Sequence, residues 1–109
     1  MAETFYNARL AATTSYADIY TCPASATCLV LTCRATNIDG TNAATVSIRV
    51  LDSDGSTATR IAETISVPAD SSLEIAGTSK IVLETGDKLQ GLASATGDIE
   101  IFASVLTLT

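Results

Sequence analysis

The sequence has 109 residues, of which 47% are hydrophobic and 17% are charged, so it fits one folded domain over residues 1–109 and excludes a disordered chain. Six basic residues against twelve acidic residues give a net charge of −6, which excludes nucleic acid as a partner because phosphate binding needs clustered Lys and Arg. No apolar run reaches the length of about 18 residues that a membrane span needs, and the first ten residues lack the order of a signal peptide. We therefore expect synthesis in a cytoplasm, without membrane contact.

The first third of the chain is predicted to form strands. Short runs of strand-forming residues are separated by turn residues, and no stretch of about a dozen residues has the apolar spacing of a helix. The first two strands are predicted over residues 4–12 and 16–22, and Pro23 ends the second because it lacks a backbone donor. A third strand is predicted over residues 27–38. The residues predicted to share one face of this strand are Leu29, Leu31, Cys33 and Ala35.

The middle of the chain contains two turn signals. Residues 37–42 have turn chemistry, and Val46, Ile48 and Val50 then alternate with polar residues, so this run is predicted to pair with strand 27–38 as a hairpin. The Asp54-Gly55 pair predicts a second hairpin turn before a strand over residues 58–67. The residues predicted to be buried on this strand are Ile61, Ile65 and Val67.

The last third continues the pattern. Leu73 and Ile75 predict a short strand that Gly77 interrupts, and residues 81–84 predict another. The final two strands, residues 88–95 and 98–108, are predicted to pair across Thr96-Gly97. About eight or nine short strands, without helices for parallel crossovers, predict an all-β antiparallel sandwich of the jelly-roll type.

The cysteines do not suggest a metal site. Cys22, Cys28 and Cys33 are an odd number, and the chain contains no histidine, so neither a zinc site nor a complete disulfide framework is expected. We expect reduced thiols, with Cys33 packing as a small hydrophobic residue. A bridge between Cys22 and Cys28, across the intervening turn, remains an alternative.

The chemistry of the chain does not favour an enzyme. The absence of histidine removes the commonest general base, and the two lysines, Lys80 and Lys88, are expected near solvent-exposed turns. Two carboxylates alone could support glycoside hydrolysis, but a small sandwich without Trp has little room for a sugar cleft. We therefore expect no catalytic residues and no cofactor.

One loop has the spacing of a calcium site. Asp52, Asp54 and Glu63 are placed as in an EF-hand loop, but Thr57 stands where that loop requires Gly, and no flanking helices are expected. A hairpin turn is the favoured interpretation, and a calcium-dependent adhesion domain is a remaining alternative.

The hydrophobic pattern at the two ends of the chain predicts an interface. In the final strand, Ile99, Ile101, Ala103 and Val105 form one apolar face, and the opposite face is apolar too. The second face needs cover from a partner, or from a loop or strand of the same chain. The residues proposed for an oligomer or partner interface are Phe5, Tyr6, Leu10, Phe102, Leu106 and Leu108.

Four segments carry a resemblance to a known group of proteins. They are residues 20–24 (Tyr-Thr-Cys-Pro-Ala), 37–42 (Asn-Ile-Asp-Gly-Thr-Asn), 65–74, which contains Val67-Pro68-Ala69, and 80–89, which contains Leu83-Glu84-Thr85-Gly86-Asp87. Across most of its length, the chain resembles small virion proteins of tailed bacteriophages. The resemblance implies a jelly-roll-like sandwich in a capsid-decoration, neck or tail position. The segments are structural corners, so no functional residue is carried over from the family.

The resemblance and the apolar ends together predict a structural virion protein. The leading expectation is a capsid decoration protein, a homotrimer that binds the major capsid protein or other virion proteins across subunit junctions. Its acidic charge suits the outside of a particle, away from packaged DNA. The alternatives are a neck, tail or fibre component, and a carbohydrate- or receptor-binding module. The scarcity of aromatic residues for sugar stacking counts against the last alternative.

Overall fold

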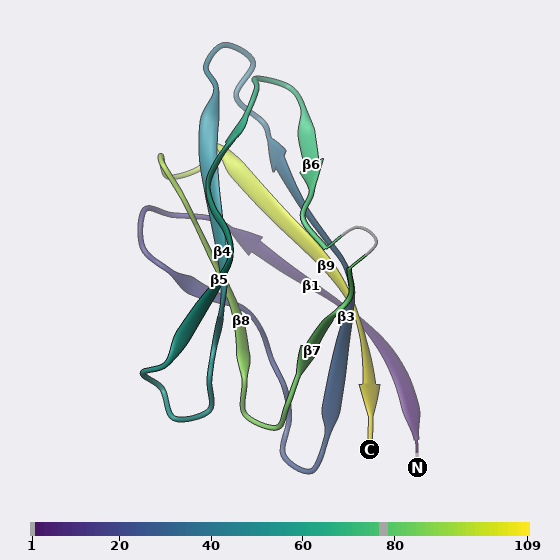
Figure 1. The fold of residues 1–109 in the computed structure, drawn as a ribbon. Coiled ribbons are helices and arrows are strands. Elements are labelled where there is room, and N and C mark those ends of the chain that lie inside the picture. The colour runs from purple at the N-terminus through teal and green to yellow at the C-terminus, as the bar shows by residue number, and fades with distance from the viewer. Residues whose placement is uncertain (1, 77–78) are drawn as a thin grey trace.

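The computed structural model describes residues 2–76 and 79–109, which form nine strands in two antiparallel sheets (Figure 1). In spatial order, sheet A consists of β1 (Glu3–Ala11), β9 (Ile99–Leu108), β3 (Thr27–Asn37) and β6 (Ser72–Glu74), with β7 (Ile81–Leu83) also paired to β3. Sheet B consists of β2 (Ala17–Thr21), β8 (Lys88–Ala93), β4 (Ala44–Leu51) and β5 (Ala58–Val67). The predicted all-β antiparallel sandwich is confirmed.

The connections between the sheets give a jelly-roll order. The chain changes sheet at every connection except β4 to β5 and β6 to β7. Because β6 pairs with one end of β3 and β7 with the other, the two short strands share one edge position of sheet A. Each sheet therefore has four strand positions, as in a jelly roll. The predicted break at Gly77, between β6 and β7, lies outside the described residues.

Two predicted hairpins are wrong. β3 pairs with β9, β6 and β7 in sheet A, whereas β4 pairs with β5 and β8 in sheet B. Similarly, β8 and β9 lie in different sheets. A turn signal marks a chain reversal but does not say whether the next strand joins the same sheet or crosses to the other. The hairpin predicted at Asp54-Gly55 is confirmed, because β4 and β5 are antiparallel neighbours.

The crossing that follows β3 is fixed by a buried amide. The Nδ2 group of Asn37 donates to the carbonyl oxygens of Asn42 and Val67, both at 3.0 Å. Its Oδ1 atom accepts the N–H of Asp39 at 2.9 Å. One side chain thus joins the end of β3 to the turn and to the end of β5, so it holds the two sheets together at this corner.

The inner faces of the sheets form the core. Ile99, Ile101, Ala103 and Val105 of β9 are buried there, as predicted. The face predicted for β3 is only partly correct, because the pairing with β9 shifts register between Val30 and Thr32. As a result, the buried residues of β3 are Cys28, Val30, Cys33, Ala35 and Asn37, while Leu29 and Leu31 are half-buried.

The prediction for β5 is also partly wrong. Val67 is fully buried, but Ile61 and Ile65 are 41% and 39% exposed. The reason is that β5 is an edge strand of sheet B, with irregular pairing to β4 around Ile48. An edge strand lies at the rim of the sandwich, with a neighbouring strand on one side only. The opposite sheet therefore covers its side chains less completely.

The two chain ends lie together. Ala2 and Thr109 exchange two backbone hydrogen bonds, each of 2.9 Å, beyond the pairing of β1 with β9. Figure 1 shows both termini at the same end of the sandwich. In the described part of the chain, no helix is long and apolar enough to cross a membrane.

Candidate interaction surface

A continuous apolar row crosses the outer face of sheet A. The strand register places Phe5 opposite Leu106, Leu106 opposite Leu29, and Leu29 opposite Val82. Phe5 and Val82, at the two ends of the row, are 72% and 57% exposed, whereas the two leucines between them are half-buried. We call these four residues the apolar row. It spans every strand position of the sheet and leaves large hydrophobic side chains in contact with solvent.

A mixed row runs parallel to the apolar row, farther from the chain ends. The register places Arg9 opposite Phe102, Phe102 opposite Arg34, and Arg34 opposite Glu74. The Arg9 guanidinium lies 5.7 Å from the centre of the Phe102 ring, within range of a cation–π interaction. Arg34 and Glu74 form an ion pair of 3.7 Å. This row adds charged groups of both signs beside the hydrophobic ones.

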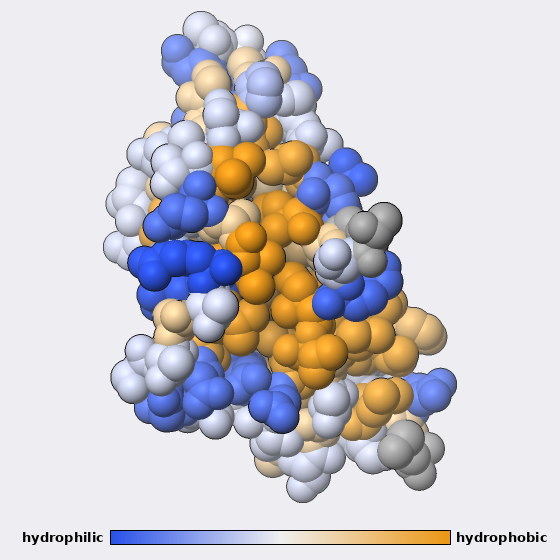
Figure 2. Space-filling model, viewed as in Figure 1, coloured by the Kyte–Doolittle hydropathy of each residue, from blue (hydrophilic) through white to orange (hydrophobic). Residues whose placement is uncertain are grey.

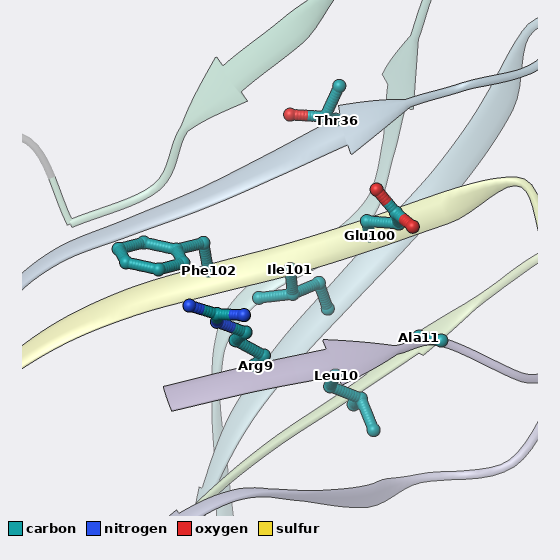
Figure 3. A pocket seen from close by; sticks show the side chains of 7 residues that line it. All are labelled: Arg9, Leu10, Ala11, Thr36, Glu100, Ile101 and Phe102. Carbon is teal, nitrogen blue, oxygen red and sulfur yellow. The ribbon is translucent and has the colours of Figure 1, made fainter. Parts of the chain in front are cut away.

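An open depression lies at the end of this outer face that is remote from the termini. Figure 3 shows its lining, which consists of Arg9, Leu10, Ala11, Thr36, Glu100, Ile101 and Phe102. The functional groups it offers are one guanidinium, one carboxylate, one hydroxyl and one aromatic ring. Among residues 2–76 and 79–109, no group of three or more Cys, Asp or Glu residues could hold a metal ion.

The six residues proposed from the sequence lie on two different faces. Phe5, Phe102, Leu106 and Leu108 project from the outer face of sheet A, whereas Tyr6 and Leu10 lie opposite the buried residues Val105 and Ile101. The Tyr6 ring is 6.3 Å from the ring of Tyr20 on β2, and Leu10 packs against the core. Leu10 therefore belongs to the sandwich itself, whereas Tyr6 contacts Tyr20 and is still 48% exposed.

Leu29 and Val82 were missed by the sequence analysis. The register shift in β3 turns Leu29 outward, and no local pattern reveals that shift. Val82 is the central residue of the three-residue strand β7, and only its pairing with Leu29 places it in the apolar row.

The outer face of sheet B is polar across its centre. Gln90 donates to Asp18 at 2.8 Å and accepts from Arg49 at 2.8 Å, so three neighbouring strands are linked by side-chain hydrogen bonds. The hydrogen bond from Gln90, together with the one from Lys88, lowers the pKa of Asp18. Arg49 also stacks over the Tyr16 ring at 3.8 Å. The polar groups of this face satisfy one another, in contrast to the exposed hydrophobic groups of sheet A.

A second apolar region lies at the open edge between the sheets. Figure 2 shows a hydrophobic band between β5 on one side and β6 and β7 on the other. The half-buried residues that pack against the core here are Ala62, Leu73, Ile75 and Ile81. Ile65 adds to this edge, since it is opposite the buried Val46 and yet remains partly exposed. The core is therefore less completely covered at this edge than in its centre.

The carboxylates of the calcium-like loop do not converge. Both oxygens of Asp54 accept hydrogen bonds within the turn, from the backbone of Ser56 and Thr57 and, at 2.6 Å, from the Thr57 hydroxyl. These bonds lower the pKa of Asp54 to about 2. Glu63 lies on β5, where it forms an ion pair of 3.3 Å with Arg60. The geometry is that of a closed hairpin turn.

No family model matches the sequence, and no curated protein matches it. A similar solved structure comes from Bacillus endospore appendages, described as a novel family of disulfide-linked pili, with 22% identity, a TM-score of 0.55 and coverage of 99% of this chain and 87% of that chain. The T13 particle of infectious bursal disease virus gives 9% identity and a TM-score of 0.56, covering 96% of this chain and 30% of the viral chain. The VP2 subviral particle of the same virus gives 12% identity and a TM-score of 0.51, covering 96% of this chain and 32% of the viral chain. At these identities the likeness shows a shared β-sandwich fold.

Proposed function

We propose that this protein is a structural subunit of a larger assembly, most specifically a capsid decoration protein of a tailed phage virion. The observation that carries the proposal is the apolar row, Phe5, Leu106, Leu29 and Val82, which crosses the whole outer face of sheet A. Exposed hydrophobic groups that extend across a sheet mark a contact surface for another protein. The proposed role is binding, without catalysis or a cofactor.

The size of the outer face suits such a contact. Four strand positions about 4.8 Å apart and a ten-residue strand rising about 3.3 Å per residue give a face of roughly 19 by 33 Å, or about 600 Å². A stable protein–protein interface buries about 800 Å² on each partner. The face supplies most of this area, and the adjoining open edge adds to it.

The arrangement of the two faces supports an orientation on a particle. Sheet A would contact neighbouring subunits through the apolar and mixed rows, and the polar face of sheet B would point to solvent. The net charge of −6 suits the outside of a shell that encloses DNA. A homotrimer across a junction of capsid subunits would need two contacts, one with itself and one with the major capsid protein, for which the outer face of sheet A and the open edge are the two surfaces proposed.

A repeating position in a neck, tail, fibre or other filament is the second candidate. The observation that favours it is the match to the appendage structure, which covers 87% of that chain, whereas the matches to the viral particles cover 30% and 32% of theirs. A fold of similar size thus occurs in a pilus. A filament forms when one surface of each subunit binds a different surface of the next subunit. The outer face of sheet A and the open edge of the sandwich could serve as these two surfaces.

The first experiment is to count copies of this chain in purified particles from its source, by quantitative mass spectrometry against the major capsid protein. Hundreds of copies would support decoration, whereas six, twelve or a few dozen would support a neck, tail or fibre position. Absence of the chain from particles would overturn the virion proposal.

The second experiment tests the contact surface. In wild-type chain and in Phe5→Asp and Leu106→Asp variants, molar mass is measured by light scattering over a concentration series. We expect the wild type to associate and both variants to remain monomeric with a β-type circular dichroism spectrum. Thr21→Asp is the matched control, because Thr21 is exposed on β2 beside Lys88. Variants that associate as well as the wild type would exclude the apolar row as the contact.

A further inference from the structure

The turn between β2 and β3 brings two buried thiols into contact. Cys22 follows β2, Cys28 is the second residue of β3, and their Sγ atoms are 2.9 Å apart. The two side chains are only 2% and 1% exposed. The separation is shorter than an ordinary contact between two thiols, although it is longer than a disulfide bond of about 2.05 Å.

The backbone on both sides of the pair is held in place. The N–H of Cys22 donates to the Asp87 carbonyl at 2.9 Å, and the Cys22 carbonyl accepts the N–H of Gly86 at 3.1 Å. Cys28 lies in the ladder between β7 and β9, opposite Leu83 and Thr107. The two sulfur atoms are therefore brought together by the fold of the sandwich, because neither backbone segment can move away without breaking pairing elsewhere.

The turn itself is compact. Ser25 has a φ of 59°, in the left-handed region, and the Thr85 hydroxyl donates to the Ala26 carbonyl at 2.6 Å. The same carbonyl accepts the Cys22 thiol at 3.4 Å. Pro23, Ala24 and Ser25 are exposed, so the turn that joins the two buried cysteines faces solvent.

The thiols are protected in the folded state. Burial, followed by the contact with Cys28, raises the pKa of Cys22 to about 12. Thiolate is the reactive form in disulfide exchange, so Cys22 reacts slowly at neutral pH in the folded protein. Oxidation consequently requires folding in the presence of an oxidant, or opening of the exposed turn.

We propose that Cys22 and Cys28 are a dithiol site that forms an intrachain disulfide with a small-molecule disulfide as the oxidant. One thiol loses its proton and attacks the small disulfide, which gives a mixed disulfide and releases one small thiol. The second cysteine, also as thiolate, attacks the protein sulfur of the mixed disulfide and releases the second small thiol. The protein loses two protons and two electrons, and the oxidant is reduced to two thiols.

Cys33 is excluded from this bridge by its position. It lies opposite Ala103, five residues farther along β3 than Cys28, which places its backbone roughly 16 Å away at about 3.3 Å per residue. A disulfide requires Cα atoms within about 7 Å of each other. Cys33 is fully buried, and burial raises the pKa of its thiol to about 12. It stays a thiol while the other two cysteines are joined.

The test uses the wild-type chain, which is unfolded and refolded in a mixture of oxidised and reduced glutathione at mildly alkaline pH. After acid quenching and denaturation, free thiols are alkylated and the intact mass is measured. We expect a monomer with a single alkyl group and a mass lower by two hydrogens for the bridged pair. Fragmentation of the tryptic peptide Leu10–Arg34, which contains all three cysteines, should place the alkyl group on Cys33. Three alkyl groups, a bridge that includes Cys33, or a disulfide between two chains would overturn the proposal.

Variants provide the matched controls. Cys33→Ala should keep the bridge, whereas Cys28→Ala should carry two alkyl groups and no intrachain bridge. Because the bridge closes a short loop of the unfolded chain, oxidised wild type should melt roughly 5–10 °C above reduced wild type. The mass measurement on wild type decides the proposal even if a variant fails to fold, and it does not depend on the proposed structural role of the protein.

Discussion

Phe5 on β1 and Leu106 on β9 lie directly opposite each other on the outer face of sheet A, and Phe5 keeps 72% of its surface exposed. An aromatic side chain that packs so little within its own chain adds little to the stability of the fold. We expect Phe5 to contribute to the free energy of binding when another protein surface covers it, since burial of an aromatic ring stabilises an interface.

Phe5→Ser should therefore affect association much more than the stability of the fold. The free energy of unfolding of the monomer should change by less than about 1 kcal/mol, whereas the dissociation constant for self-association or partner binding should rise about tenfold or more. Denaturant unfolding and analytical ultracentrifugation measure the two quantities. A large loss of stability with unchanged association would assign Phe5 to the fold instead of the contact.

Glu74 is predicted to stabilise β3 through a backbone hydrogen bond. Its Oε2 atom accepts the N–H of Cys33 at 2.7 Å, while its ion pair with the largely exposed Arg34 is longer and weaker. Glu74→Ala should lower the free energy of unfolding by about 1–2 kcal/mol, because a part-buried donor loses its acceptor.

The control for this prediction is Glu74→Gln, which keeps an acceptor oxygen and should retain most of the stability. Chemical denaturation of both variants distinguishes the two contributions. Equal losses in the two variants would mean that the negative charge matters more than the hydrogen bond.

Gly91 on β8 is predicted to be required by close packing. A Cβ atom at this position would lie 2.7 Å from Cδ1 of Ile101, 3.1 Å from Cδ1 of Ile48 and 3.3 Å from Cδ1 of Ile19. Gly91→Ala should therefore destabilise the protein by about 1–3 kcal/mol, although the tips of the isoleucines can move slightly.

A double-mutant cycle checks the cause. Ile101→Val removes the methyl group that the new Cβ would strike, so Gly91→Ala should cost less in that background than in the wild type. Equal costs in the two backgrounds would show that the strain has another source.

The Asp54 turn predicts a dependence of stability on acid pH. Its hydrogen bonds to Thr57 and Ser56 lower the pKa of Asp54 to about 2, compared with about 3.9 in an unfolded chain. A lowered pKa in the folded state means that the stabilisation is complete above about pH 4 and disappears as the pH falls towards about 2.

Melting temperatures of wild type and Asp54→Asn test this at several pH values. The wild type should melt higher above pH 4, and the difference should shrink between about pH 4 and pH 2, as the wild-type carboxylate takes up its proton. A difference that stays constant over this range would show that the charge of Asp54 does not contribute.

The sequence was sufficient to predict the strands, their packing as a sandwich and the β4–β5 hairpin, but not the pairing of the other strands. Residues 27–38 and 58–67 were predicted as strands and correspond closely to β3 and β5, because alternation and turn residues are local properties. The sheet that each strand joins depends on contacts far along the chain. The pairing of β9 between β1 and β3 is an example that no turn sequence specifies.

The candidate surface was also predicted only in part, because it depends on which strands pair. The alternation of β9 placed Phe102 and Leu106 on the face opposite the buried one, where the structure has them, and their role in a contact stays a prediction. Tyr6 and Leu10 could not be assigned to a face without knowing the partner of β1. Leu29 became part of the surface only through a register shift in β3, a feature set by the packing of the whole sheet.

The two backbone hydrogen bonds between Ala2 and Thr109 have a practical consequence for engineering the chain. Because β1 and β9 end side by side, the two termini could be joined by a short linker and the chain reopened elsewhere, with the order of the strands in space unchanged. The exposed Asp54-Gly55 turn between β4 and β5 is a suitable place for the new ends. In such a circular permutant, β1 and β9 become a hairpin. A peptide attached to the new termini would leave the sandwich from the same end as the original termini, but beside sheet B, where Ser53 of this turn donates to Asp87 (Figure 1).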